Sequence, residues 1–155
     1  MRVLIASDHA GYDLKQEVLR FITEGLGLEA EDVGTYNRDS CDFPDYAIRV
    51  ARGVVAGEAD LGILLCGTGI GMCAAANKVP GAVAALCSEC YSAWAARSHN
   101  DANILCLGGR VIGPELAKQV VRAFLTAERD DGVRHVGRRA KVAALDCARR
   151  EEGAQ

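Results

Sequence analysis

The sequence predicts a single three-layer α/β/α domain, in which a five-stranded parallel sheet of Rossmann-like type lies between two layers of helices. Short apolar runs alternate along the chain with longer amphipathic segments, as in repeated strand-and-helix units. The runs are apolar at consecutive positions, which is typical of parallel strands that helices cover on both faces. The length of 155 residues corresponds to one domain with a hydrophobic core of its own.

The first half of the chain is expected to form two strands and two helices. Residues 3–6 are four consecutive apolar side chains, which favour a buried strand, and residues 14–26 carry apolar side chains on one helical stripe. A short second strand fits residues 31–34. After a polar loop, Pro44 stands where a helix can begin, and this helix is expected to end near residue 57.

The second half begins with the clearest strand of the sequence, residues 61–66, which leads into a glycine-rich loop and a helix of small residues over 72–78. The remaining elements are strands at 82–87 and 104–107 and helices at 90–98, 111–127 and 136–150. The last helix is basic on one side and apolar on another. Residues 1–150 are expected to form the domain, and residues 151–155 a disordered tail.

Composition and charge restrict the possible partners. The net charge is −3, so no general positive field attracts nucleic acid. No apolar run approaches the roughly 20 residues of a membrane helix, and the first residues lack the layout of a signal peptide. We therefore expect a cytoplasmic protein that binds neither nucleic acid nor a membrane.

The seven cysteines are interpreted as reduced thiols, because their number is odd and no export signal is present. Cys87 and Cys90 have CxxC spacing, but a zinc site needs about four ligands and no second pair follows at a usable distance. No metal site is therefore expected. A thiol redox function of this pair stays open as an alternative.

Polar residues gather where the predicted strands end, which is where ligands bind to parallel sheets. Asp8 and His9 follow the first strand, Cys66 ends the third, and Arg110 follows the fifth. The group at 99–101, His-Asn-Asp, precedes the fifth strand instead. Three of the four polar groups are thus expected at the ligand-binding edge.

The loop 66–71, CGTGIG, carries the most chemical information. Gly67, Gly69 and Gly71 let the backbone approach a ligand, and N–H groups at a helix start can hold a phosphate or stabilise an oxyanion. The Cys66 thiol is either a core side chain or a base activated by that helix start, and the adjacent loop favours the second interpretation. A non-catalytic nucleotide-binding module could use the same loop.

Several charged residues permit two interpretations each. His9 and His99 can exchange protons near neutral pH or lie as plain surface or capping histidines. Asp8 can act with them or cap the first helix. The basic residues of the tail are either a solvated helix face or a phosphate clamp, and they are Arg134, His135, Arg138, Arg139 and Lys141.

The chain carries six short motifs in order: SDHAG at 7–11, DFPDYA at 42–47, CGTGIG at 66–71, AANK at 75–78, SHND at 98–101 and GGR at 108–110. Together they resemble the ribose-5-phosphate isomerase B family, which includes galactose-6-phosphate and allose-6-phosphate isomerases. The resemblance extends from residue 2 to about residue 145. It implies an aldose–ketose isomerisation through an enediolate, without metal or cofactor.

The resemblance also assigns roles in the chemistry. His99, helped by Asp8, would open the sugar ring, Cys66 would move the proton between C1 and C2, and Thr68 would act at the substrate oxygens. Some members carry a glutamate base where this chain has Met72, and a thioether is no useful proton acceptor. Cys66 is therefore the only candidate base.

Substrate binding follows from the same resemblance. Backbone N–H groups around Gly67, Gly69 and Gly71 would stabilise the enediolate together with Asn100, and Tyr46, which its pattern alone marks as a packing residue, would join the binding site. The phosphate would be held by His9, Arg110, Arg134 and Arg138. Spacing alone leaves Arg139 open in place of Arg138.

The two tail arginines would come from a partner subunit, on which the C-terminal helix would pack, so we expect a homodimer or a dimer of dimers with shared active sites. The expected reaction is the ribose 5-phosphate to ribulose 5-phosphate step of pentose phosphate metabolism. Galactose 6-phosphate, allose 6-phosphate and a four-carbon keto-phosphate are alternative substrates, because pocket depth sets the sugar length.

Overall fold

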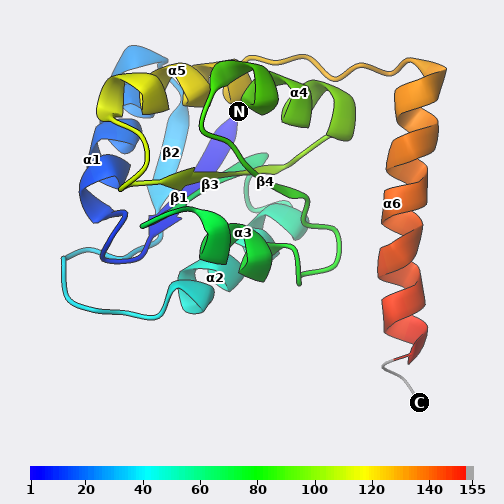
Figure 1. Ribbon diagram of the computed structural model, residues 1–155, viewed down its shortest axis with the longest axis horizontal. Coiled ribbons are helices and arrows are strands. Elements are labelled where there is room, and N and C mark those ends of the chain that lie inside the picture. The colour runs from blue at the N-terminus through cyan, green and yellow to red at the C-terminus, as the bar shows by residue number, and fades with distance from the viewer. Residues whose placement is uncertain (153–155) are drawn as a thin grey trace.

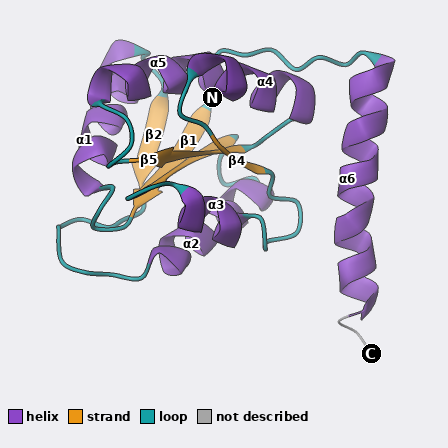
Figure 2. Ribbon diagram, in the orientation of Figure 1, coloured by secondary structure: helices purple, strands orange, loops and turns teal. Residues whose placement is uncertain are grey.

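The computed structural model describes residues 1–152, with side-chain surroundings up to residue 146. Its five strands form one sheet in the order β2-β1-β3-β5-β4 (Figure 2). All four strand pairings are parallel, which confirms the predicted sheet. The strands are β1 (Arg2–Ser7), β2 (Glu29–Asp32), β3 (Leu61–Cys66), β4 (Ala84–Leu86) and β5 (Ile104–Gly108).

Helices cover both faces of this sheet, as predicted (Figure 1). On one face lie α1 (Tyr12–Arg20), α4 (Cys90–Asn100) and α5 (Pro114–Leu125), and on the other α2 (Phe43–Val55) and α3 (Ile70–Ala76). The buried apolar side chains accordingly form two clusters, one on each face. Because side chains alternate along a strand, Leu65 belongs to the α1 cluster and Cys66 to the α2–α3 cluster.

Two expected boundaries near the start of the chain are wrong. The helix expected over 14–26 begins at Tyr12, ends at Arg20 and continues as the π-helical turn η1 (Phe21–Gly25). The strand expected at 31–34 is β2, which ends at Asp32 because Gly34 adopts a φ of +113°, outside the strand region. Further along, the strand predicted over 61–66 is confirmed with its bounds, and the other predicted elements keep their type with ends that shift by up to three residues.

The last helix, α6 (Val133–Glu152), stands beside the rest of the molecule (Figure 1). Its side chains at Val142 and Leu145 are 58% and 63% exposed. The carboxylate of Asp146 accepts a 2.8 Å hydrogen bond from the Gly81 N–H, which ties the helix to the α3–β4 loop. Of the expected tail at 151–155, residues 151 and 152 belong to α6, and residues 153–155 lie outside the described residues.

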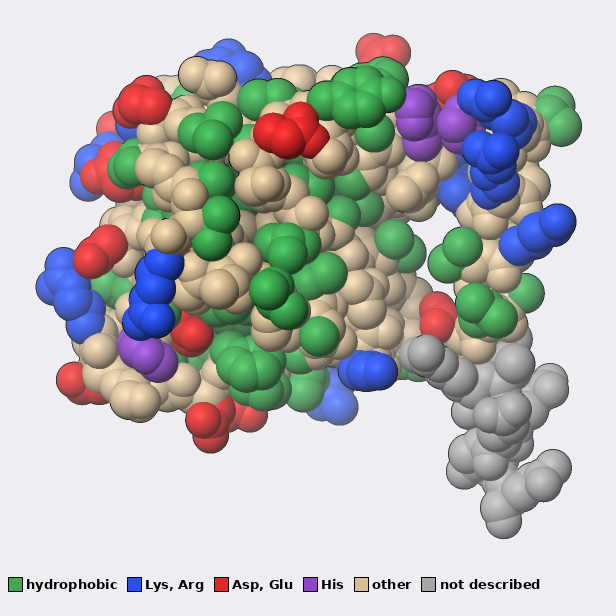
Figure 3. Space-filling model, in the orientation of Figure 1, with side chains coloured by type: hydrophobic (Ala, Val, Ile, Leu, Met, Phe, Trp, Pro, Cys, Tyr) green, Lys and Arg blue, Asp and Glu red, His purple; other side chains and the backbone are tan. Residues whose placement is uncertain are grey.

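The charged surface is unevenly distributed. Figure 3 shows Lys and Arg side chains gathered over the first half of α6, next to histidine side chains, with an opening between α6 and the body below them. The basic cluster predicted from the tail is thus a coherent patch on one helix. Within residues 1–152, no helix combines the length and the apolar content that crossing a bilayer requires.

Candidate active site

The central feature of the site is the sulfur of Cys66, at the carboxyl end of the middle strand β3. The residue is only 5% exposed, and its Sγ accepts a 3.1 Å hydrogen bond from the Gly69 N–H. This geometry supports the interpretation of Cys66 as a reactive group at a loop.

The glycine loop depends on Gly69 for its path. This residue has a φ of +80°, and a Cβ placed on it would lie 2.4 Å from Leu86 Cδ1 and 2.9 Å from the Leu107 carbonyl carbon. No other residue type fits without a shift of its neighbours. The close packing aims the Gly69 N–H at Cys66, so this N–H, one of the donors expected for the enediolate, already has a partner within the chain.

The same loop is fastened to the end of β5. The Gly109 N–H donates to the Cys66 carbonyl at 2.8 Å, and the Arg110 N–H donates to the Gly67 carbonyl at 2.9 Å. The Arg110 side chain folds over Gly67, since a Cβ placed there would be 3.6 Å from Arg110 Nη1. A guanidinium group is therefore held beside Gly67, the residue after Cys66, where it can attract an anion.

Two further loop residues flank the sulfur. Thr68 is exposed, and its Oγ1 accepts a 3.3 Å hydrogen bond from the Ile70 N–H, which leaves the hydroxyl hydrogen available to a ligand. Gly71 lies in the first turn of α3 against the Phe43 ring, 2.9 Å from where its Cβ would be. Phe43 thus closes one side of the loop.

Asp8 and His9 follow β1 at the same edge of the sheet. The buried Asp8 carboxylate accepts hydrogen bonds from the Ala10 and Gly11 N–H groups, at 2.9 and 3.0 Å. Asp8 therefore shapes the turn before α1, close to the capping role that the sequence left open. The His9 Nδ1 accepts from the Cys41 N–H at 3.3 Å, so the neutral ring carries its proton on Nε2.

Tyr46 packs next to this edge. A Cβ on Gly34 would lie 2.6 Å from its Cε1 atom, so the half-buried ring covers the turn that follows β2. The Ser7 N–H donates to the Gly34 carbonyl at 2.7 Å and thereby joins this turn to the end of β1. The packing role that the pattern indicated for Tyr46 is present.

His99 and Asn100 lie at the opposite end of the strands, where β3 and β5 begin. They end α4, and the strand that follows pairs Ile104 with Gly62 at the start of β3, whereas Gly108 pairs with Cys66 at its end. Four residues of strand, about 13 Å, separate the two levels. A single chain therefore brings Asp8, His9, Cys66, Thr68 and Arg110 together but leaves out His99 and Asn100.

The His99 side chain contacts a separate set of residues. Its ring stacks on the His135 ring of α6 with centroids 4.3 Å apart, and the Trp94 ring meets it edge-on at 5.0 Å. Asp130 Oδ2 lies 3.5 Å from His135 Nε2. We call His99, Trp94, Asp130 and His135 the His99 cluster. Asp130 has no sequence signal, because only the fold brings the α5–α6 loop to the end of α4.

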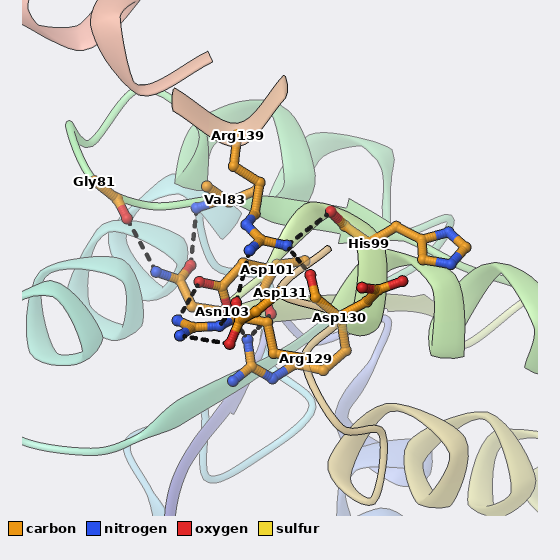
Figure 4. A network of polar contacts seen from close by, with 11 residues as sticks. Gly81, Val83, His99, Asp101, Asn103, Arg129, Asp130, Asp131 and Arg139 are labelled. Atoms are coloured by element: carbon orange, nitrogen blue, oxygen red, sulfur yellow. Dashed lines mark hydrogen bonds and ion pairs between the residues drawn. The ribbon is translucent and has the colours of Figure 1, made fainter. Parts of the chain in front are cut away.

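The arginines of α6 differ in what they contact. Arg139 donates to the carbonyl oxygens of His99 and Asp130, at 3.3 and 2.7 Å, and pairs with Asp131 (Figure 4). Arg134 and Arg138 are exposed on the same helix, and an Arg134 nitrogen approaches His135 Nε2 at 3.5 Å. Arg139 therefore holds the protein together here, whereas Arg138 presents its guanidinium to the surface.

Among the described residues, His99, Asp130 and His135 bring three potential metal-ligand atoms within 4.8 Å of one another. The two imidazole planes are only 15° from parallel, however, so their in-plane lone pairs do not converge on one point. Arg134 also lies at the Nε2 atom of His135. The cluster is therefore poorly suited to hold a cation.

Three cysteines outside the loop have shifted pKa values, and a hydrogen bond with Cys73 together with burial raises the pKa of Cys106 well above its usual value. A hydrogen bond from Cys106 lowers the pKa of the Cys73 thiol on α3 to about 7. Burial raises the pKa of Cys87 to about 11. A CxxC redox pair requires a nucleophilic cysteine with a depressed pKa, so Cys87 argues against the redox alternative.

The fold and the site define a single-domain parallel α/β protein that presents a thiol, a glycine loop and a guanidinium group at the carboxyl edge of its sheet. The model of the ribose/galactose isomerase family matches residues 3–142. The chain belongs to this family, which confirms the resemblance carried by the six motifs.

Individual relatives agree over nearly the whole length. The chain is 45% identical over 145 residues to ribose-5-phosphate isomerase B of Escherichia coli K12, covering 94% of this chain and 96% of that protein. It is 43% identical over 136 residues to D-erythrulose-4-phosphate isomerase of Pectobacterium atrosepticum, covering 85% and 87%. The structure of Clostridium thermocellum ribose-5-phosphate isomerase B is similar with a TM-score of 0.91 at 46% identity, covering 96% and 99%.

Proposed function

We propose that this enzyme interconverts ribose 5-phosphate and ribulose 5-phosphate in the cytoplasm, with Cys66 as the general base. The observation that carries the proposal is the position of Cys66, at the carboxyl edge of the sheet with the Gly69 N–H on its sulfur and Arg110 beside it. Relatives at similar identity are named for ribose 5-phosphate and for D-erythrulose 4-phosphate. The four-carbon sugar is therefore the second substrate to test.

The reaction moves one proton between neighbouring carbons. Cys66, acting as the base, takes the proton from C2 of the open-chain aldose, and the electron pair forms the C1–C2 double bond of an enediolate. The C2 hydroxyl then gives up its proton and O1 takes one up, with Thr68 as the proposed carrier, and Cys66 returns its proton to C1 to leave the ketose. A proton next to a carbonyl is only weakly acidic, so the barrier falls mainly through stabilisation of the developing negative charge. In this proposal the Thr68 hydroxyl and the N–H groups of Gly67 and Gly71 supply that stabilisation.

In this proposal the phosphate is held by hydrogen-bond donors at the same edge. The Arg110 guanidinium lies over Gly67, and His9 has its Nε2–H free of the contact that Nδ1 makes with Cys41. Both groups can hold the phosphate away from the reacting carbons, where its binding energy orients the substrate. Asp8 and Tyr46 support this edge, Asp8 through its turn and Tyr46 through packing.

A second copy of the chain completes the site in this proposal. Measured along the strands, about 13 Å separates the end of α4, with His99 and Asn100, from the end of β3, with Cys66. The exposed Arg134 and Arg138 lie on the projecting helix α6. The exposed Val142 and Leu145 give that helix an apolar surface to bury. We therefore propose a homodimer or dimer of dimers in which each chain supplies His99, Asn100, Arg134 and Arg138 to its partner's Cys66.

The decisive experiment is a turnover assay with ribose 5-phosphate, allose 6-phosphate, galactose 6-phosphate and D-erythrulose 4-phosphate. We expect the highest kcat/KM with ribose 5-phosphate. Cys66→Ala should reduce kcat by roughly 10²- to 10⁴-fold with little change in substrate affinity, because it removes the base and leaves the phosphate contacts.

Cys90→Ala is the matched control, because Cys90 is a half-buried cysteine at the start of α4, away from the loop. It should keep wild-type turnover. If Cys66→Ala retains near-normal kcat, the proton is moved by another group and the proposed role of Cys66 is wrong.

A further inference from the structure

The surroundings of His99 are unusually specific for a side chain at a helix end. One face of its imidazole is covered by the His135 ring at 4.3 Å and 15°, and the Trp94 ring approaches at 73°. Such contacts fix the plane of the ring, which would otherwise rotate freely about two torsions. The arrangement holds one orientation of His99 with respect to α4.

His135 is itself anchored. Its side chain is only 10% exposed, although α6 is otherwise largely exposed, and its Nε2 lies 3.5 Å from Asp130 Oδ2. The Asp130 carboxylate in turn accepts a 2.7 Å hydrogen bond from the Gly132 N–H, and Arg139 binds the carbonyl oxygens of both Asp130 and His99. The backbone segments that carry the two stacked rings, the end of α4 and the start of α6, are therefore linked by these hydrogen bonds.

We propose that His135 is a positioning residue for the ring-opening step, which holds the His99 imidazole in the orientation that proton transfer to the sugar requires. The proposal rests on the proposed function and on the ring-opening role that the family resemblance implies for His99. In that step the C1–O4 bond breaks, the C1 hydroxyl loses its proton and O4 gains one. An imidazole can carry out such transfers only when its nitrogen faces the oxygen within hydrogen-bond reach.

The charge state of His135 agrees with this role. Burial lowers the pKa of His135, and Asp130 opposes this effect. The nearby His99, Arg134 and Arg138 lower the pKa further. The Trp94 ring and Arg139 are the remaining groups packed around the pair. A neutral His135 places no second positive charge on the face of His99, so His99 can gain and lose a proton during the reaction.

The test separates ring opening from the chemistry at Cys66. Ribulose 5-phosphate is acyclic, because its O5 carries the phosphate and cannot close a five-membered ring onto C2. Incorporation of solvent deuterium at C1 of ribulose 5-phosphate therefore needs the base and no ring opening, whereas conversion of ribose 5-phosphate needs both. His99→Ala defines how a pure ring-opening defect changes the two rates.

We expect His135→Ala to lower kcat with ribose 5-phosphate by about 10- to 100-fold, in line with the cost of a misplaced catalytic group, while deuterium incorporation stays at the wild-type rate. His135→Phe keeps a flat ring against His99 and should restore most of the turnover. Val136→Ala, an exposed neighbour on α6, is the control and should match the wild type.

Imidazole NMR gives a readout independent of turnover. The His99 ring signals should shift in His135→Ala and return toward their wild-type positions in His135→Phe. Parallel loss of both rates in His135→Ala, unchanged rates, or failure of His135→Phe to recover would each overturn the positioning role while the proposed function stands. A wild-type enzyme that converts no sugar phosphate would overturn the proposed function, and the role of His135 with it.

Discussion

At the scale of single residues, Lys15 is a charged side chain that is completely buried. Lys15 has no exposed side-chain surface, and its Nζ contacts both Asp32 oxygens at 2.6 and 2.7 Å and the Thr35 carbonyl at 2.5 Å. A buried ammonium group is tolerated only when such partners replace its water. The pair fixes the turn after β2, against which Tyr46 packs.

Removing the carboxylate should therefore be costly. We expect Asp32→Ala to lower the free energy of unfolding by about 3–5 kcal/mol, because Lys15 would remain charged and buried without its partner. Asp13→Ala is the matched control: Asp13 pairs with Arg38, and both side chains are more than 70% exposed. Its loss should cost at most about 1 kcal/mol in urea unfolding. Equal effects of the two substitutions would contradict this account.

At the scale of elements, the turn between β3 and α3 joins packing to chemistry. Gly69 combines a positive φ with a site where a Cβ would touch Leu86 and the Leu107 backbone. Its N–H is also the donor to Cys66. A change at this residue must therefore alter both the position of the loop and the environment of the sulfur.

Gly69→Ala tests this connection against a substitution with the same backbone strain. Gly57 has a φ of +78°, and a Cβ there meets nothing within 4 Å. Both variants should lose about 1–2 kcal/mol from the unfavourable φ, and Gly69→Ala more because of its contacts. Only Gly69→Ala should also lower kcat, by roughly 10²-fold, as expected for a displaced donor. Wild-type turnover in Gly69→Ala would show that the N–H contact has no catalytic role.

The elements also show how much of the fold and of the site can be predicted from the sequence. The strand over 61–66, the loop after it and the placement of Asp8 and Arg110 at one edge were predictable, because consecutive apolar residues and the parallel-sheet rule determine them. The end of β2 depends on the conformation of Gly34, and the π-helical turn replaces the last part of a helix whose apolar period is the same, so periodicity predicts neither. The neighbours of His99 depend on where α6 lies relative to α4, which is a long-range contact without a local pattern.

At the scale of the whole molecule, the sequence-predicted groups divide between two edges of one sheet. Cys66, Thr68, His9 and Arg110 belong to one edge, and His99 with Asn100 to the other. The proposed dimer would pair the first set of one chain with the second set of its partner. In that arrangement neither set can act within its own chain.

Mixing two inactive variants tests the shared site. Cys66→Ala and His99→Ala homodimers should both be nearly inactive with ribose 5-phosphate. A mixed dimer, formed by joint unfolding and refolding, contains one site in which Cys66 and His99 are both wild type, so activity should return on mixing. If the mixture stays as inactive as its components, Cys66 and His99 act in the same chain or not together.

The placement of these two groups on opposite edges also affects how the enzyme starts to work. A freshly folded chain already holds its thiol and its imidazole in place, yet they lie at opposite ends of the strands. Under the dimer proposal, such a chain is inactive until it associates with a second copy, so the onset of turnover after synthesis is second order in protein concentration. The rate at which copies encounter one another, rather than the completion of folding, would then decide when sugar phosphates begin to be consumed.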